Sequence, residues 1–165
     1  MDAGWLVDGV VSQSEAQAKS LWQLREGISE SLAAYTPYKN DLSVRISEVP
    51  GFLADVDRYV SESYPEFEVC WYGHIGDGNL HLNILRPEDM SVEEFFEHGH
   101  GMSPKIFEIV AARRGSISAE HDVGLLKRDF LGYTRSDDEI ELMQGLKALF
   151  DPHQILNPNK LLSSR

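Results

Sequence analysis

The sequence predicts an α+β fold in which helices cover an antiparallel or mixed sheet. Segments of strand-like composition alternate with segments whose apolar residues recur at helical spacing. Two strand-like segments, residues 67–75 and 80–85, are separated only by a Gly-rich turn, and strands joined by so short a connection must be antiparallel. The chain has 165 residues, of which 42% are hydrophobic, so we expect one domain of ordinary size spanning residues 1–165.

Serine residues mark the starts of three predicted helices. Ser91 and Ser136 are each followed three residues later by a glutamate, as in a capping box, where each side chain accepts a hydrogen bond from the other residue's backbone. Ser12 stands in the same relation to Glu15. A fourth helix is indicated by apolar residues at helical spacing after Pro50. We expect helices over residues 12–32, 50–63, 91–112 and 136–149.

Five segments have the composition and the flanking turn residues that are typical of strands. They are residues 4–11, 38–46, 67–75, 80–85 and 115–119. Only the two segments on either side of the Gly-rich turn have a register that can be predicted from the sequence, because only they share a tight turn.

That turn contains Asp77 and Gly78, which suit a type I′ turn because both residue types tolerate a positive φ. Such a turn would place His74 directly opposite His81. Directly opposed side chains have Cβ atoms roughly 5 Å apart, so both imidazoles could bind one cation, with Asn83 on the same face. The opposite face would then carry the apolar residues Ile75, Leu80, Leu82 and Ile84.

A metal site needs more than two imidazoles, and a carboxylate is the usual third ligand where cysteine is absent. Glu120 and His121 are the best candidates, because they follow the predicted strand 115–119 where it gives way to a loop. Adjacent side chains of a regular strand point to opposite faces, so both can serve one pocket only if the backbone bends. Alternatively, each histidine is an ordinary polar residue, and Glu120 and His121 form a solvated pair.

Composition excludes several classes of partner. The formal net charge is −12 and no basic stripe is present, so we expect no nucleic acid partner. An acidic substrate would need local cations to reverse this field. The single cysteine, Cys70, can form neither an intramolecular disulfide nor a thiolate zinc cage, which fits a reducing compartment. A cytoplasmic location is the default expectation, because the targeting region of a longer protein would not be visible here. No apolar run approaches the roughly 20 residues that span a bilayer.

Three motifs resemble the signature runs of the FAD-linked oxidase C-terminal domain family. They are GHIGDGNLHLN at residues 73–83, GSISAEH at residues 115–121 and LNPNK at residues 156–160. The resemblance covers nearly the whole chain and keeps the family's motif order. This family, related to vanillyl-alcohol oxidase, includes D-lactate dehydrogenases, glycolate oxidase subunits and D-2-hydroxyglutarate dehydrogenases. The chain is most similar to the last branch in LWQLRE at residues 21–26, KNDLS at residues 39–43 and LMQGLKAL at residues 142–149.

The resemblance implies a ferredoxin-like α+β cap that packs on a separate flavin domain. His74, His81 and Glu120 would bind a divalent metal, expected to be zinc, and His121 would be the general base. The reaction would be oxidation of a D-2-hydroxy acid, such as 2-hydroxyglutarate or lactate, to the 2-oxo acid, with hydride transfer to FAD. Substrate contacts would come from Arg25, Ser29, Lys39 and Asn83, and cofactor contacts from Asn157 and Lys160.

Two positions depart from the family pattern. Asp122 stands where the family usually has a glycine after the motif histidine, and Ser29 stands where a threonine is expected. Aspartate tolerates a positive φ better than most residues, but it adds a negative charge beside the proposed base.

The residues of this chain include no flavin-binding domain, so we expect a fragment of a longer protein that is inactive alone. Its partners would be the flavin domain of that protein and a small 2-hydroxy acid, and an uncovered apolar face would favour a homo-oligomer. Two other functions remain open. The chain could be a non-catalytic α+β module that binds a metal or a small acid, or it could be an inactive structural remnant.

Overall fold

The computed structural model describes residue 4 and residues 7–162, and the chain divides into two units. The first unit ends at Tyr35 and contains α1 (Glu15–Glu26) and α2 (Ile28–Ala33). These two helices replace the single helix predicted over residues 12–32. The interruption falls at Gly27, a residue type with low helix propensity.

The strand predicted over residues 4–11 is wrong for residues 7–11, which form no strand. The side chains of Val7, Val10 and Val11 are exposed. Among the described residues, no strand pairs with this segment, and β-branched side chains stabilise a strand only when it packs against neighbours. Trp5 and Leu6, which belong to the same prediction, lie outside the described residues.

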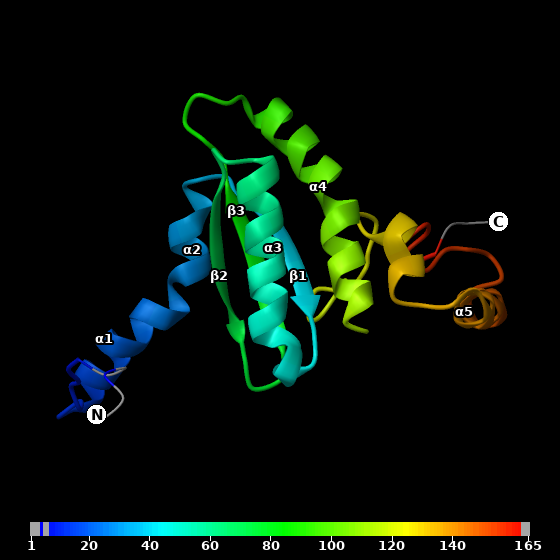
Figure 1. Cartoon of the computed structure of the whole chain (residues 1–165). Helices are drawn as coiled ribbons and strands as arrows, with labels where there is room; N and C mark the ends of the chain where they lie inside the picture. The colour runs from blue at the N-terminus through cyan, green and yellow to red at the C-terminus, as the bar shows by residue number, and fades with distance from the viewer. Residues whose placement is uncertain (1–3, 5–6, 163–165) are drawn as a thin grey trace. The chain divides into compact units, whose positions relative to one another are not determined.

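The second unit contains a small antiparallel sheet with helices, which confirms the predicted α+β fold. Its strands are β1 (Tyr38–Ser43), β2 (Glu68–His74) and β3 (Asn79–Leu85), in the spatial order β1-β3-β2. Both strand pairs are antiparallel. The helices are α3 (Val49–Ser63), which follows β1 after a short 3-10 turn (Ile46–Glu48), and α4 (Val92–Ala112), which follows β3 (Figure 1).

The hydrophobic core lies between one face of the sheet and these two helices. Leu80, Leu82 and Ile84 alternate along β3 and are buried there. The helices contribute large buried side chains, among them Phe52 from α3 and Phe107 from α4. Because side chains alternate along a strand, the residues between the apolar ones in β3 face the other side of the sheet.

The strand predicted over residues 115–119 is reduced to one isolated antiparallel bridge, between Ser43 and Ser116. The bridge lies beside β1, where the fourth strand of a ferredoxin-like arrangement would lie. The ladder does not extend because side chains bind the neighbouring backbone groups. The Asp41 carboxylate accepts the N–H of Ala119, and Lys127 donates to the carbonyl of Ile117.

The chain continues through a 3-10 segment (Arg128–Tyr133) into α5 (Asp137–Phe150). The capping box predicted at Ser136 is confirmed, with Glu139 as its partner. Ser91 likewise caps α4 by accepting the N–H of Glu94. Within the described residues, no helix is both long enough and apolar enough to traverse a bilayer.

Candidate metal and base site

The hairpin register differs from the predicted one by two residues. His74 pairs with Asn79, and Tyr72 pairs with His81. His74 and His81 are therefore diagonal neighbours rather than directly opposed residues. They still share one face, because paired residues and residues two positions apart on a strand point to the same side.

The prediction failed at the turn, which occupies residues 75–78. Gly78 has a φ of +78°, but Asp77 has no positive φ, so the turn is not type I′. The carbonyl of Gly78 accepts the N–H of Val44 at 3.2 Å, and a Cβ at Gly78 would lie 1.9 Å from the Val44 oxygen. Ile75 lies in the turn and is exposed, so its predicted place on the core face is wrong.

Glu120 lies against both histidines of the hairpin. Its Oε1 is 2.7 Å from Nδ1 of His74, and its Oε2 is 3.9 Å from Nε2 of His81. The amide of Asn79 also donates to Oε1 at 2.6 Å. One ligand atom from each of His74, His81 and Glu120 lies within 4.8 Å of the other two. Two imidazoles and a carboxylate at this separation can surround a single divalent cation.

Asp41, on β1, is a site residue that the sequence analysis did not identify. Its side chain is 5% exposed, and its Oδ2 accepts three backbone hydrogen bonds. The donors are the N–H groups of Ala119, Glu120 and His121, at 2.9, 2.8 and 2.9 Å. These bonds bend the backbone around one carboxylate, which explains how two adjacent residues serve one site. The available signal was the polar run Lys39 to Asp41 inside a predicted strand.

His121 lies next to the three candidate ligands. Its ring stacks on that of His81, with the centroids 5.4 Å apart, and its Nδ1 is 3.9 Å from Oδ2 of Asp41. The other carboxylate oxygen of Asp41 is 3.4 Å from Nδ1 of His81. The His121 side chain is 68% exposed, so it is accessible to a small molecule.

The protonation states of His81 and of the two carboxyl groups suit metal binding. Burial lowers the pKa of His81, although Asp41 and Glu120 oppose this shift, so the imidazole is neutral at pH 7. The hydrogen bond from His74 is the largest cause that lowers the pKa of Glu120. Burial alone would raise the pKa of Asp41, but the N–H groups of His121, Glu120 and Ala119 hold it below its ordinary value. Both carboxyl groups are therefore ionised at neutral pH.

Two predicted substrate contacts, Lys39 and Asn83, face each other across β1 and β3. Lys39 is exposed, whereas Asn83 is 1% exposed and donates to the carbonyl of His81 at 3.2 Å. Within the described residues, the side-chain oxygen of Asn83 has no hydrogen-bond partner. The other two predicted contacts, Arg25 on α1 and Ser29 on α2, belong to the first unit. The substrate role of all four stays a prediction.

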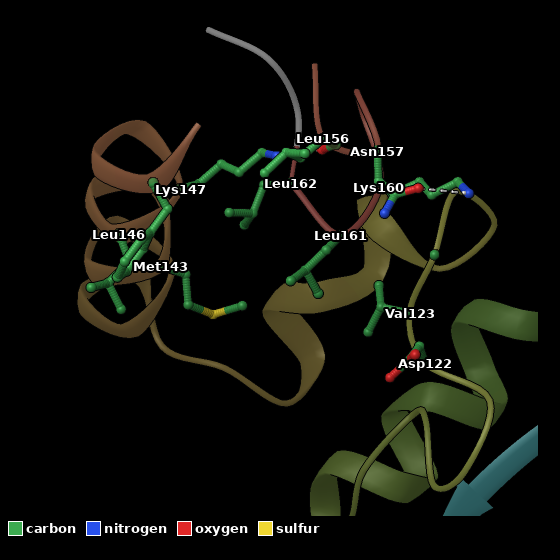
Figure 2. A pocket seen from close by; sticks show the side chains of 12 residues that line it. Asp122, Val123, Met143, Leu146, Lys147, Leu156, Asn157, Lys160, Leu161 and Leu162 are labelled. Atoms are coloured by element: carbon green, nitrogen blue, oxygen red, sulfur yellow. Dashed lines mark hydrogen bonds between the residues drawn. The ribbon is translucent and has the colours of Figure 1, made fainter. Parts of the chain in front are cut away.

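The two predicted cofactor contacts, Asn157 and Lys160, line a cavity of about 730 Å³ (Figure 2). Lys160 donates to the side-chain oxygen of Asn157 at 3.4 Å. Asp122 and Val123 form part of the wall, so the cavity begins one residue beyond His121. Its apolar lining comes largely from α5 and the C-terminal segment: Met143, Leu146, Phe150, Leu156, Leu161 and Leu162.

The backbone at Asp122 has a φ of +61°, in the left-handed region that favours glycine. This conformation suits the glycine that the resemblance leads us to expect here. Aspartate is among the side chains that adopt this conformation at low cost.

Comparison with known proteins assigns the family. The family model described as FAD linked oxidases, C-terminal domain, matches residues 1–161. The chain belongs to this family. It is 54% identical to the D-2-hydroxyglutarate dehydrogenase of Stutzerimonas stutzeri (strain A1501) over 164 residues. These residues make up 99% of this chain and 35% of that protein.

Other relatives carry the same name. The D-2-hydroxyglutarate dehydrogenase of Xanthomonas citri pv. viticola is 52% identical over 99% of this chain and 35% of its own length. The mitochondrial D-2-hydroxyglutarate dehydrogenase of Bos taurus is 41% identical over 98% of this chain and 29% of its own length. This FAD-linked oxidase C-terminal domain thus spans about a third of the length of such relatives. The family description implies FAD as the cofactor.

Proposed function

We propose that this chain is the substrate-side part of a dehydrogenase that oxidises a D-2-hydroxy acid to the 2-oxo acid. The observation that carries the proposal is the convergence of His74, His81 and Glu120, with His121 beside them. Membership of a family of FAD-linked oxidases supports redox chemistry, and the names of the relatives support 2-hydroxyglutarate as the first substrate to test.

The donor set fits a divalent cation. His74 and His81 offer imidazole nitrogens and Glu120 an ionised carboxylate, and three such ligands leave one tetrahedral position for a substrate oxygen. Zinc is the metal that this combination suits best. When bound there, the metal would polarise the substrate hydroxyl and lower its pKa.

His121 would take the hydroxyl proton. Its Nδ1 faces the buried carboxylate of Asp41, so Nε2 is the nitrogen that is free to accept. The ionised carboxylate of Asp41 would stabilise the imidazolium that forms. Removal of the proton makes the α-carbon a better hydride donor, and FAD would supply the hydride acceptor.

The substrate carboxylates would be held by local cations, because the chain carries a net charge of −12. Lys39 lies on the same sheet face as His81. Arg25 belongs to the first unit, and its proposed role rests on the resemblance and on its planar guanidinium, which suits a carboxylate. Ser29 and Asn83 would add polar contacts, and Asn157 and Lys160 would contact the flavin.

A chimera tests the enzymatic proposal. The C-terminal part of the Stutzerimonas stutzeri relative would be replaced by this chain, and flavin reduction by D-2-hydroxyglutarate would be followed under anaerobic conditions. We expect reduction by the D but not the L enantiomer, and a much slower rate with His121→Asn, because that variant lacks the proton acceptor. If no D-2-hydroxy acid reduces a chimera loaded with FAD and zinc, the chain is a binding module or a remnant instead.

The metal is tested separately by zinc titration of the isolated chain. We expect one zinc per chain, and loss of binding in His74→Ala and His81→Ala. His153→Ala is the matched control, because His153 is an exposed histidine outside the site and its loss should leave zinc binding unchanged. No stoichiometric zinc in the unmodified chain would refute the metal site.

A further inference from the structure

We infer that Asp41 is the positioning residue of this site. With one carboxylate oxygen it fixes the backbone of residues 119–121, and with the other it selects the tautomer of His81 that leaves Nε2 facing Glu120. This role deepens the proposed function and rests on it, although the tautomer can be measured without any metal.

The first part of the argument is the number of donors that meet one oxygen. Oδ2 of Asp41 accepts the N–H groups of Ala119, Glu120 and His121 within 2.9 Å. Hydrogen bonds to an ionised acceptor are about twice as strong as bonds between neutral groups. Three such bonds to consecutive residues fix the direction in which the side chains of Glu120 and His121 leave the backbone.

The backbone that carries this carboxylate is held in place by other hydrogen bonds. Lys127 donates to the backbone carbonyl of Asp41 at 2.8 Å and to that of Ile117 at 2.5 Å. Ser43 and Ser116 exchange backbone hydrogen bonds of 2.9 and 2.8 Å. Strand β1 and the segment that leads to Glu120 are therefore tied together independently of the Asp41 side chain.

The second part of the argument concerns His81. Its Nδ1 is 3.4 Å from Oδ1 of Asp41, which is buried and has no hydrogen-bond partner in the described part of the chain. A carboxylate oxygen can only accept, so it favours a proton on the nitrogen that faces it. Glu120 also faces the ring, but its Oε2 is farther away, 3.9 Å from Nε2, and its carboxylate already accepts from His74 and Asn79. The nearer, otherwise unpaired oxygen of Asp41 therefore favours a proton on Nδ1, and Nε2 keeps its lone pair. A carboxylate that orients a metal-binding histidine in this way is a recurrent feature of metal sites.

The ring has little freedom to turn away. The His81 side chain is 12% exposed and contacts the rings of Tyr72 and His121, with centroids 4.9 and 5.4 Å away. Asp41 therefore determines which ring nitrogen of His81 carries the proton, while the neighbouring rings fix the position of the imidazole.

An asparagine at position 41 cannot both accept the three N–H groups and accept from His81, because an amide has only one acceptor oxygen. Asp41→Asn therefore removes one of the two roles. If that oxygen faces the three N–H groups, the NH₂ group faces His81 and drives its proton to Nε2, where it blocks metal binding. If the amide is reversed, three N–H groups lose their acceptor. Either arrangement weakens the site.

The experiment is ¹⁵N NMR of the histidine rings in the metal-free chain, followed by zinc titration. We expect the Nδ1–H tautomer of His81 in the unmodified chain, and a shift towards Nε2–H together with a 10- to 100-fold weaker zinc affinity in Asp41→Asn. Asp151→Asn is the matched control. Asp151 is 4% exposed and accepts the N–H groups of Ile155 and Leu156. It has no contact with the site histidines His74, His81 and His121 among the described interactions, so neither the His81 tautomer nor the zinc affinity should change.

The outcomes are distinguishable. An Nε2–H tautomer in the unmodified chain overturns the inference and requires no variant, so a misfolded Asp41→Asn leaves this test intact. Zinc affinity that is unchanged by Asp41→Asn also overturns it. If the tautomer shifts as expected but neither chain binds zinc, Asp41 positions His81 and the proposed metal site is wrong.

Discussion

The ammonium group of Lys127 lies between strand β1 and the segment that leads to Glu120. It donates to the carbonyls of Asp41 and Ile117, and burial lowers its pKa from 10.5 to about 8, partly opposed by the charge of Asp41. The charged form is therefore less favourable in the folded chain than in the unfolded one. Lys127 therefore makes the free energy of unfolding depend on pH between about 8 and 10.5.

The sign of that link can be predicted. Between pH 8 and pH 10 the unfolded chain holds the Lys127 proton more tightly than the folded chain does, so the free energy of unfolding rises with pH. We expect this residue to contribute an increase of about 2 kcal/mol over the window. Urea denaturation of the unmodified chain and of Lys127→Met at several pH values measures it. Identical pH slopes in the two proteins would show that Lys127 has an ordinary pKa.

At the scale of elements, the hairpin turn is the feature on which the ligand geometry depends. Gly78 has a φ of +78° and is packed against the carbonyl of Val44, whereas Gly76 has no positive φ and open space around it. The two glycines of one turn therefore differ in what they tolerate.

We expect Gly78→Ala to destabilise the chain by about 2 kcal/mol or more, because the new Cβ meets both a steric clash and an unfavourable φ. Gly76→Ala should change stability by less than about 1 kcal/mol, and it serves as the control. Chemical denaturation measures both. Equal losses of stability would mean that the turn is not held by its contact with Val44.

The elements that were predicted correctly are those whose signals are local. The capping serine and helical periodicity located α4 and α5, and the alternation of Leu80 and Leu82 located the core face of β3. The register of the hairpin and the strand 115–119 were wrong because distant residues decide them. Gly78 is held by Val44, and the backbone after Ile117 is held by Asp41 and Lys127.

Some residues of the candidate site could be selected from the sequence, and one could not. His74, His81 and Glu120 were selected from residue type, turn chemistry and resemblance, and they lie together. Asp41 was not selected, because a single aspartate inside a strand looks like an edge charge until its hydrogen bonds are known.

At the scale of the whole molecule, the proposed ligands come from segments far apart in the chain. His74 and His81 lie on the hairpin and Glu120 follows α4, so a bound metal would join the sheet to the segment beyond that helix. A ligand that binds only the folded chain stabilises it, by about 2.7 kcal/mol at 100 times its Kd.

We therefore expect zinc to raise the Tm of the chain, and Glu120→Gln to remove this effect. Differential scanning calorimetry with and without zinc measures the shift. The control is Glu108→Gln, since Glu108 is an exposed glutamate on α4 that pairs with Lys105. A zinc-dependent Tm in Glu120→Gln equal to that of the unmodified chain would remove Glu120 from the ligand set.

Apolar side chains on and after α5 remain exposed, among them Leu142, Leu149, Phe150 and Ile155. Such a surface favours association, so the homo-oligomer stays a prediction for the isolated chain. Light scattering across a range of concentrations measures its mass. A monomeric mass throughout would contradict the prediction, and Leu149→Glu should shift the equilibrium towards monomer if it is correct.

The alternation along β3 limits how this protein can change during evolution. Leu80, Leu82 and Ile84 build the core, while Asn79, His81 and Asn83 occupy the alternate positions on the face of the site. Inserting or deleting one residue within the strand would exchange the two sets, exposing the leucines and burying the histidine. Lineages can therefore vary this strand by substitution, but a change in its length would remove the fold and the chemistry in a single step.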